Sequence, residues 1–388
     1  MSSSKSVVVV GYGTMGVTHT RKITGVEGLD VTGAVDTNSY RQEAAREDGL
    51  HVYPDLAAAL ADDTVDIVLI ATPNDDHFPI AVAALGAGKH VLCEKPAMLD
   101  SQEMTKVAEL AERQGRLFMV HQNRRWDPDY AAMKRVYDEG TIGPVTYVET
   151  RIHGSRGIPG DWRGEAARGG GMLLDWGVHL VDRLLLMVGA PLTTVYGSLS
   201  HDLGKEVEDG VKAYLTFANG VRALVDVSTS SFVTLPKWYL QSARGTAVVE
   251  DWEMHGKVVV LEDEDEADAT PIQAGAGMTK TMAPRLIDFK ALARIQDSVS
   301  VLPLPDVAPD IDDWYRNALA VIDGIDGIDG TVVVGQTVRN DQVIRTLRVL
   351  EAIRESHETG TAVVFEPAAE TAAETAAGSA VRPVAAGA

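Results

Sequence analysis

The sequence predicts an α/β protein with a doubly wound parallel sheet in its N-terminal part and an antiparallel sheet in its second half. Two observations lead to this fold class. In the N-terminal third, continuous apolar runs alternate with helical segments, which is the pattern of parallel strands joined by crossover helices. Further along, short strand-like runs are separated by turn signals such as Asn219-Gly220, as in an antiparallel sheet.

The length of the chain indicates more than one domain. At 388 residues it exceeds a single ordinary core. We expect domains at residues 1–122 and 123–365. Residues 366–388 should form a disordered Ala/Thr/Glu tail, because they lack large apolar side chains apart from two valines.

Charge and cysteine content exclude several classes of protein. The net charge of −21 repels nucleic acid and anionic membranes, so neither is expected as a partner. No apolar run reaches the length of a membrane span, and the N-terminus shows no secretory pattern, which predicts a soluble, cytoplasmic protein. The single cysteine, Cys93, excludes an intramolecular disulfide and a cysteine-based zinc site, and we expect no metal.

The N-terminal half should contain strands and helices in alternation. The β-branched run Val7–Val10 is typical of a strand that helices cover on both faces. We expect Ser101 to cap a helix that Gly115 ends. The remaining predicted elements are a helix from Thr14 to about Thr24, strands at Val31–Val35 and Asp66–Ile70, a helix over Pro79–Ala87, and strands at His90–Cys93 and Leu117–Val120.

A glycine-rich turn follows the first strand. Gly11 makes the tight turn, Gly13 lets the backbone approach a pyrophosphate, and Gly16 lets the following helix pack closely on the strand. The helix N-terminus then favours an anion. Asp36 ends the second strand, where it would bind ribose hydroxyls and repel a 2′-phosphate. The pattern predicts NAD as cofactor, while the nearby Arg41 leaves the use of NADP open.

Two further turns follow strands of the same sheet, and ligands in such sheets lie beyond the carboxyl ends of the strands. Thr72, Pro73 and Asn74 are therefore expected along the ribose and nicotinamide. Lys95 stands where a substrate would meet the nicotinamide and could stabilise alkoxide character. In isolation, a solvated loop lysine would be the simpler interpretation of Lys95.

The stretch Gly169–Met187 predicts a mostly buried helix that starts near Gly171. Asp175 and His179 are four residues apart, a spacing that stacks side chains on one helical face. The carboxylate would orient the imidazole, which would exchange a proton near neutral pH. The alternative is an ordinary Asp/His pair on a half-exposed face.

These motifs together resemble those of the Gfo/Idh/MocA oxidoreductases. The resemblance covers about residues 6 to 365 and rests on the glycine turn, Ala71-Thr72-Pro73-Asn74, Glu94-Lys95-Pro96, the Gln122–Trp126 segment and the Asp175-x-Gly-x-His179 helix. It implies an N-terminal Rossmann domain and a C-terminal α/β domain with a large, mainly antiparallel sheet. That sheet would face the active site and form the contacts of a homodimer or homotetramer.

The resemblance also implies functional residues. Lys95, Asp175 and His179 would be catalytic, and they would bind substrate together with Arg125 and Trp126. Trp126 stands where the family usually has Tyr or Phe. The expected cofactor-binding residues are Gly11, Gly13, Thr14, Met15, Gly16, Asp36, Thr72, Pro73, Asn74, His77, Glu94, Lys95, Trp162 and Arg163.

In the second half, residues 153–170 predict a loop over the site and residues 268–310 a crossover. The acidic run Glu262–Glu266 is expected to be a solvated turn, and Asp323–Gly330 a loop without the spacing of a calcium site. Predicted helices lie at Pro128–Glu139, Ile311–Ile322 and Gln336–His357, and predicted strands at Val145–Ile152, 193–201, 211–217, 221–229, 237–243, 246–251 and 257–262.

The expected activity is NAD-dependent oxidation of a secondary hydroxyl of a sugar, inositol or related polyol. His179 would act as general base, Asp175 would orient it, and Lys95 would hold the forming oxyanion. Three alternatives remain open: a redox-neutral NAD-dependent glycosidase, a dihydrodiol or other carbonyl reductase, and a cofactor-binding sensor without turnover.

Overall fold

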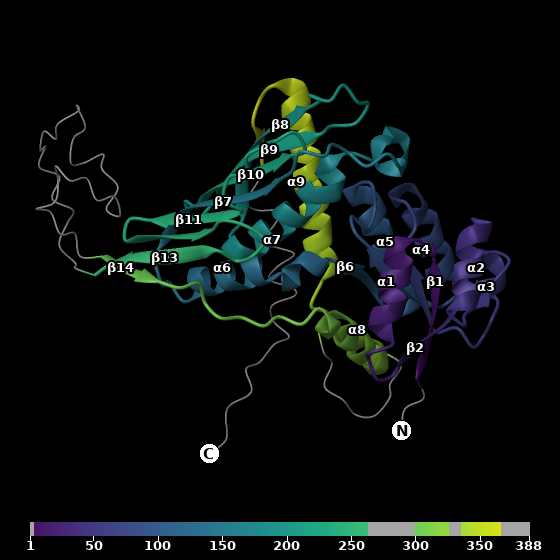
Figure 1. Cartoon of the computed structure of the whole chain (residues 1–388). Helices are drawn as coiled ribbons and strands as arrows, with labels where there is room; N and C mark the ends of the chain where they lie inside the picture. The colour runs from purple at the N-terminus through teal and green to yellow at the C-terminus, as the bar shows by residue number, and fades with distance from the viewer. Residues whose placement is uncertain (1–3, 263–298, 326–334, 366–388) are drawn as a thin grey trace, which may run out of the picture.

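The computed structural model describes residues 4–262, 299–325 and 335–365. Figure 1 shows two lobes, each built on one sheet, with the long helix α9 (Asn340–Thr359) standing between them. α9 packs on α5 of the first lobe and on α7 and β8 of the second. One helix therefore holds the two sheets together.

The first sheet is six-stranded and parallel throughout, with the order β3-β2-β1-β4-β5-β6. The strand order reverses between β1 and β4, which places the ligand crevice of a Rossmann fold at their carboxyl ends. The strands are β1 (Lys5–Val10), β2 (Leu29–Val35), β3 (His51–Val52), β4 (Ile67–Ile70), β5 (His90–Glu94) and β6 (Phe118–His121). The helices are α1 (Thr14–Ile23), α2 (Ser39–Glu47), α3 (Leu56–Leu60), α4 (His77–Gly86) and α5 (Ser101–Gln114).

The central strands of this sheet form the core of the first lobe. Every residue of β4, β5 and β6 is buried, which the continuous apolar runs predict for strands covered on both faces. One predicted cap is wrong: Asp100, and not Ser101, accepts the backbone N–H of Glu103 at 2.7 Å. Gly115 ends α5 in the left-handed conformation, as the sequence predicts.

The second sheet has nine strands in the order β14-β13-β12-β11-β7-β10-β9-β8-β15. It is mainly antiparallel, as expected, with one parallel pair between β7 and β10. The strands are β7 (Val145–His153), β8 (Leu192–Ser200), β9 (Gly210–Phe217), β10 (Arg222–Ser228), β11 (Trp238–Ser242), β12 (Gly245–Val249), β13 (Gly256–Leu261), β14 (Val299–Leu302) and β15 (Val363–Val364).

Helices cover one face of the second sheet, and close packing fixes α9 against it. A Cβ on Gly197 of β8 would lie 2.6 Å from the carbonyl oxygen of Ile353, so the strand and the helix touch backbone to backbone. Tyr196 and Tyr214 are half exposed on the opposite face. The helices of this lobe are α6 (Pro128–Asp138), α7 (Val178–Val188) and α9, whereas α8 (Asp312–Ile325) packs on the first lobe beside α1 (Figure 1). The homodimer or homotetramer expected through this sheet stays a prediction.

Three predicted features fall mainly outside the described ranges: residues 263–266 of the acidic run, residues 326–330 of the Asp-Gly-Ile repeat and the tail 366–388. Of the 268–310 crossover, residues 299–310 are described, and they include β14. Among the helices that the structure describes, none is long and apolar enough to cross a membrane.

We predict that Gly11→Ala destabilises the protein more than Gly49→Ala does. Both glycines have positive φ, +93° and +82°, so a side chain strains either backbone by about 1 kcal/mol. Only at Gly11 does the new Cβ collide, 2.7 Å from the backbone of Ala71, which adds about 1–3 kcal/mol. Urea unfolding of the two variants measures the difference. Equal losses would show that the close approach at Gly11 contributes nothing.

Candidate functional site

The two lobes meet in a charged contact between Lys95 and Asp175. Lys95 directly follows β5, and its Nζ donates to Asp175 Oδ1 at 2.8 Å and to the Asp175 carbonyl oxygen at 2.9 Å. Both side chains are mostly buried, with 17% and 16% exposed. Burial alone would raise the pKa of Asp175, but the charges of Lys95 and Arg163 hold that pKa below its usual value. The contact is therefore a stable ion pair with one ammonium N–H of Lys95 left over.

The local backbone of Asp175 differs from the predicted helix. Residues Leu173–Gly177 form a π turn, and the α-helix α7 begins only at Val178. A π turn holds more residues per turn than an α-helix, so four-residue spacing across it does not stack two side chains. The carboxylate of Asp175 bonds to Lys95 and lies 3.5 Å from Arg163 Nε, with no hydrogen bond to His179 among the described residues. Asp175 therefore positions the lysine.

The start of this helix depends on a buried acid from another strand connection. Glu208 Oε1 accepts the backbone N–H of Leu173 at 3.0 Å, and the Glu208 carbonyl accepts that of Met172 at 3.1 Å. A Cβ on Gly171 would lie 2.4 Å from the same carboxylate. The last glycine of the triple-glycine stretch is thus required so that Glu208 can reach the free N–H groups of the helix.

His179 is buried and uncharged. Its exposed fraction is 4%, and burial lowers its pKa well below the usual value, with the charges of Lys95, Arg124 and Arg183 acting in the same direction. Neither ring nitrogen forms a hydrogen bond within the described part of the chain, and Nδ1 is buried without a partner. The imidazole is therefore a neutral base with a free nitrogen, next to the ring of Trp176 at 5.9 Å between centroids.

Glu94, which directly precedes Lys95, lies under the site. Its Oε1 accepts from His19 Nε2 and from His121 Nδ1, both at 2.8 Å, and His19 Nδ1 contacts the hydroxyl of Tyr315 at 2.7 Å. Burial raises the pKa of Glu94, but the two imidazoles outweigh it and hold the pKa well below its usual value. The three side chains could also hold a metal ion. Hydrogen bonds at normal distances already account for their arrangement.

The glycine turn has the shape expected of a dinucleotide site. A Cβ on Gly16 would lie 2.2 Å from the Gly11 carbonyl oxygen, and one on Gly13 would face only the end of Arg41, at 3.4 Å. Asp36 accepts the backbone N–H groups of Tyr12 at 2.7 Å and of Asn38 at 2.8 Å. The carboxylate of Asp36 is thereby fixed at the end of β2, with Arg41 3.7 Å away.

The turn after β4 is braced from behind by His77. This side chain is fully buried, and its nitrogens contact the carbonyl oxygens of Thr72 and Ala97, both at 3.0 Å. A cofactor-binding role for His77 is therefore indirect, because the side chain is used inside the protein. Asn74 Nδ2 donates to the Gly169 carbonyl at 2.8 Å, which ties this turn to the loop of the second lobe.

The loop over the site pairs with both lobes, through Arg168 with Asp75 and through Arg163 with Asp175. Arg168 Nε lies 3.2 Å from Asp75 Oδ1 on the first lobe. The guanidinium of Arg163 stacks on Trp162 at 4.5 Å and pairs with Asp161 at 2.8 Å. The Trp162-Arg163 segment that the sequence singled out thus borders Asp175, while its contact with a cofactor stays a prediction.

Arg125, which the resemblance assigns to substrate binding, is bonded inside the protein. Its guanidinium makes two parallel bonds to Asp182, at 2.7 and 2.8 Å, and also donates to the Thr337 carbonyl and to Gln342. Only 7% of the Arg125 side chain is exposed. Trp126 packs against the hydrophobic core. The substrate contacts expected of Arg125 and Trp126 stay predictions.

The arginine that faces the site is the preceding residue, Arg124. Its guanidinium lies over Trp176 at 4.8 Å and over Trp252 at 5.5 Å. Lys237 Nζ lies over the same Trp252 ring, 3.5 Å from its centre. Trp176 stands inside the Asp-x-Gly-x-His motif and Arg124 inside the Arg-Arg segment, so both had a sequence signal. Lys237 and Trp252 had none, because they come from a distant part of the sheet.

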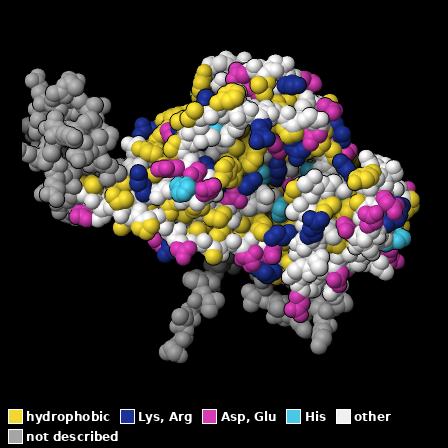
Figure 2. Space-filling model, viewed as in Figure 1, with side chains coloured by type: hydrophobic (Ala, Val, Ile, Leu, Met, Phe, Trp, Pro, Cys, Tyr) yellow, Lys and Arg dark blue, Asp and Glu magenta, His cyan; other side chains and the backbone are white. Residues whose placement is uncertain are grey.

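Unpaired buried polar atoms gather at the carboxyl ends of β4 and β6. They are Thr72 Oγ1, His121 Nε2, both amide atoms of Gln122, Asn123 Oδ1 and Arg124 Nε, and α7 adds His179 Nδ1. Each unpaired buried group costs about 1–3 kcal/mol, so a cluster of them is expected where a ligand supplies the missing partners. A dinucleotide beyond these strand ends fits this arrangement. In Figure 2, Lys and Arg side chains gather where the two lobes meet.

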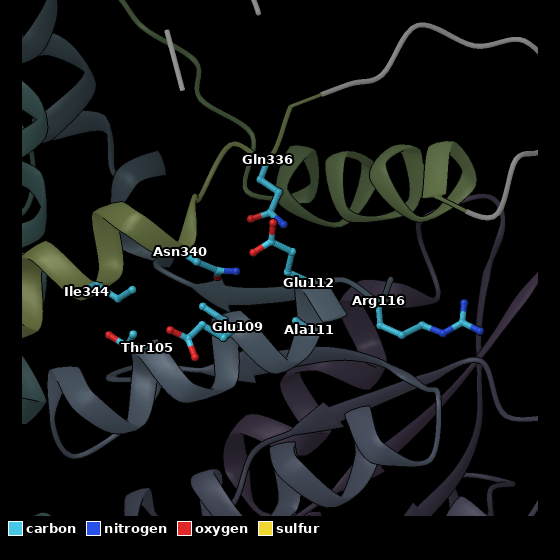
Figure 3. Close-up of a pocket in the computed structure, with 9 residues that line it drawn as sticks. Thr105, Glu109, Ala111, Glu112, Arg116, Gln336, Asn340 and Ile344 are labelled. Carbon is cyan, nitrogen blue, oxygen red and sulfur yellow. The ribbon is translucent and has the colours of Figure 1, made fainter. Parts of the chain in front are cut away.

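A separate hollow of about 350 Å³ lies between α5 and α9 (Figure 3). Thr105, Glu109, Glu112, Gln336 and Asn340 are among the residues that line it. It shares no residue with the site around Lys95 and His179.

The fold and the site define a dinucleotide-dependent oxidoreductase, with a Rossmann sheet whose ligand edge faces a lysine, a neutral histidine and a second sheet. Comparison with known families agrees. Residues 5–122 match the model described as oxidoreductase family, NAD-binding Rossmann fold, and residues 130–248 match the GFO/IDH/MocA C-terminal domain. The chain belongs to the Gfo/Idh/MocA family of NAD(P)-dependent oxidoreductases.

Individual relatives support this assignment. A solved structure titled NAD-binding protein from Listeria innocua is 38% identical, with a TM-score of 0.78 and coverage of 93% of this chain and 97% of that one. Inositol 2-dehydrogenase 2 of Saccharopolyspora erythraea is 33% identical over 57% of this chain and 65% of its own length. The Bacillus subtilis scyllo-inositol 2-dehydrogenase (NAD(+)) is 29% identical over 58% of this chain and 67% of its own length. The scyllo-inositol 2-dehydrogenase (NADP(+)) IolW of the same organism is 27% identical over 58% and 68%.

We predict that Arg125→Gln lowers the free energy of unfolding by about 3–5 kcal/mol, because Asp182 is then left as a buried charge without its bidentate partner. Arg113→Gln is the matched control, since Arg113 is 63% exposed in its pair with Glu109 and should change stability by less than about 1 kcal/mol. Urea unfolding measures both. Unchanged stability together with a raised KM for the substrate would show that Arg125 binds the substrate and does not stabilise the fold.

Proposed function

We propose that the chain is an NAD-dependent dehydrogenase that oxidises a secondary hydroxyl of a sugar, inositol or related polyol. One observation supports this most strongly: the Lys95–Asp175 ion pair lies beside the neutral, unpartnered imidazole of His179. Oxidation of an alcohol needs a base for the hydroxyl proton and a positive group for the developing alkoxide. The inositol dehydrogenases among the relatives support a polyol as substrate.

The glycine turn and Asp36 would hold NAD, and the unpaired polar atoms around Thr72 and Gln122 would lie along it. When bound, NAD supplies the acceptor for the hydride that leaves the carbinol carbon. The protein's own task is then to bind the hydroxyl, to remove its proton and to keep water away from the reacting atoms.

Proton removal falls to His179 in this proposal. Its low pKa keeps the imidazole neutral at pH 7, which is the state that accepts a proton. The third N–H of Lys95 would donate to the substrate oxygen, because Asp175 occupies the other two. Asp175 thus acts through Lys95, by fixing its ammonium group.

We predict that Lys95→Ala and His179→Ala each reduce kcat for polyol oxidation by about 10² to 10⁴-fold. Calorimetric titration with NAD should give near wild-type affinity for both variants, since neither side chain belongs to the glycine turn. The wild-type acid limb of kcat/KM should lie below the ordinary histidine pKa of about 6.5 and disappear in His179→Ala. Near wild-type turnover in both variants would remove the assignment. NAD binding with release of an aglycone and no lasting NADH would favour the redox-neutral glycosidase.

We propose NAD as the preferred cofactor because the Asp36 carboxylate is fixed at the end of β2, where an acid would repel a 2′-phosphate. Asp36→Asn keeps the shape and removes the charge, so the ratio of kcat/KM for NADP to that for NAD should rise about tenfold or more, with Arg41 3.7 Å from residue 36. Asp48→Asn is the matched control, since Asp48 also accepts from Tyr12, through its hydroxyl. An unchanged ratio in Asp36→Asn would show that this carboxylate does not select the cofactor.

A further inference from the structure

A string of alternating charges runs beside the catalytic histidine. Asp127 lies 3.1 Å from Arg124 and 3.4 Å from Arg183, and Asp129 lies 3.4 Å from Arg183 and 2.7 Å from Lys237. Each carboxylate is shared by two cations, and a cation stands at each end. The string, Arg124–Asp127–Arg183–Asp129–Lys237, therefore carries three positive charges against two negative ones.

The acids nearest to the string are paired with other groups, although Glu94, under the site, adds a negative charge that acts on His179 in the opposite direction. Asp182 is bound by Arg125, and Asp175 is itself shared by Lys95 and Arg163. On the turn that carries Trp252, Asp251 Oδ2 pairs with His255 at 2.6 Å. In a chain with a net charge of −21, this local excess of positive charge is unusual. It also contributes to the low pKa of His179 through Arg124 and Arg183.

Both ends of the string meet at Trp252. This ring is 55% exposed, with Arg124 5.5 Å and Lys237 3.5 Å from its centre. Trp176 connects the same place to the catalytic centre, because it lies 6.3 Å from Trp252 and 5.9 Å from His179. The Arg124 end is therefore separated from the base by one aromatic ring, and the Lys237 end by two.

The guanidinium of Arg124 has N–H groups without a hydrogen-bond acceptor among the described residues. Its only hydrogen bond among the described residues goes from Nη1 to Asp127, and its Nε is buried without a partner. The guanidinium is held in place by Trp176, so it loses little freedom when it binds a ligand. An anionic oxygen would satisfy the unpaired N–H and neutralise the surplus charge at once.

We propose that the substrate carries an anionic group, a carboxylate or a phosphate, which Arg124 binds beside Trp252 while His179 faces the oxidised hydroxyl. This inference rests on the proposed function and narrows its substrate class to acidic polyols. Lys237, already paired with Asp129, adds to the positive field of the subsite and does not need to touch the ligand.

The experiment titrates the NAD-loaded full-length protein with three ligands that share one ring: D-glucose, D-glucuronate and D-glucose 6-phosphate. Calorimetry should show at least one anion binding about tenfold or more tightly than glucose, with the difference shrinking at high salt. Preference for glucuronate assigns a carboxylate, and preference for the phosphate assigns a phosphate. Equal affinity for all three ligands would overturn the proposal.

Arg124→Gln should abolish the preference for the anion, and Arg124→Lys should keep part of it. Arg135→Gln is the matched control because Arg135 is 52% exposed and pairs with Glu139 on α6, so the same loss of charge there should leave the preference intact. An anion preference that survives Arg124→Gln would overturn the assignment. NADH formation is measured separately. An Arg124-dependent preference for the anion without any turnover would refute the dehydrogenase and support the anion subsite. Turnover of neutral polyols without a preference for the anion would support the dehydrogenase and refute the anion subsite.

Discussion

The contact between Lys95 and Asp175 is the constraint on which the site depends. It joins the end of a Rossmann strand to the first turn of a helix in the second lobe, across 80 positions of the sequence. An ammonium and a carboxylate that are more than four-fifths buried persist only as a well-bonded pair. Because both are fixed by this pair, the lysine is presented to the crevice in one orientation, and the helix that carries His179 is placed beside it.

Where the two lobes meet, buried acids repeatedly form bonds with two partner groups at once. One oxygen of Glu94 serves two histidines, Asp127 and Asp129 each serve two cations, and Asp182 takes both branches of Arg125. His179 is left out of this pairing, and that exclusion is what makes it a neutral base. Burial, and after it the charges of Lys95, Arg124 and Arg183, lowers the pKa of His179 and keeps a proton off the imidazole.

Much of the first lobe follows from the sequence because its signals are local. A fully buried parallel strand must be a continuous apolar run, and the strand β1 shows one. Gly11 and Gly16 of the turn are required by distances of 2.2–2.8 Å to neighbouring backbone, which leave no room for a Cβ. The short elements β3 and α3 escaped prediction because two to five residues are too few to show a period.

The sequence by itself determined the strand and helix order, the glycine turn, the acid at the end of β2 and the chemical groups of the site. The tertiary structure decided which of those groups meet. Asp175 pairs with a lysine 80 positions away and not with the histidine four positions away, because a π turn rotates it out of the expected face. Arg124 lies over Trp176 beside the site, whereas Arg125 is paired with the buried Asp182. Such choices depend on distances between segments that are far apart in the sequence, and local spacing along a chain carries no information about those distances.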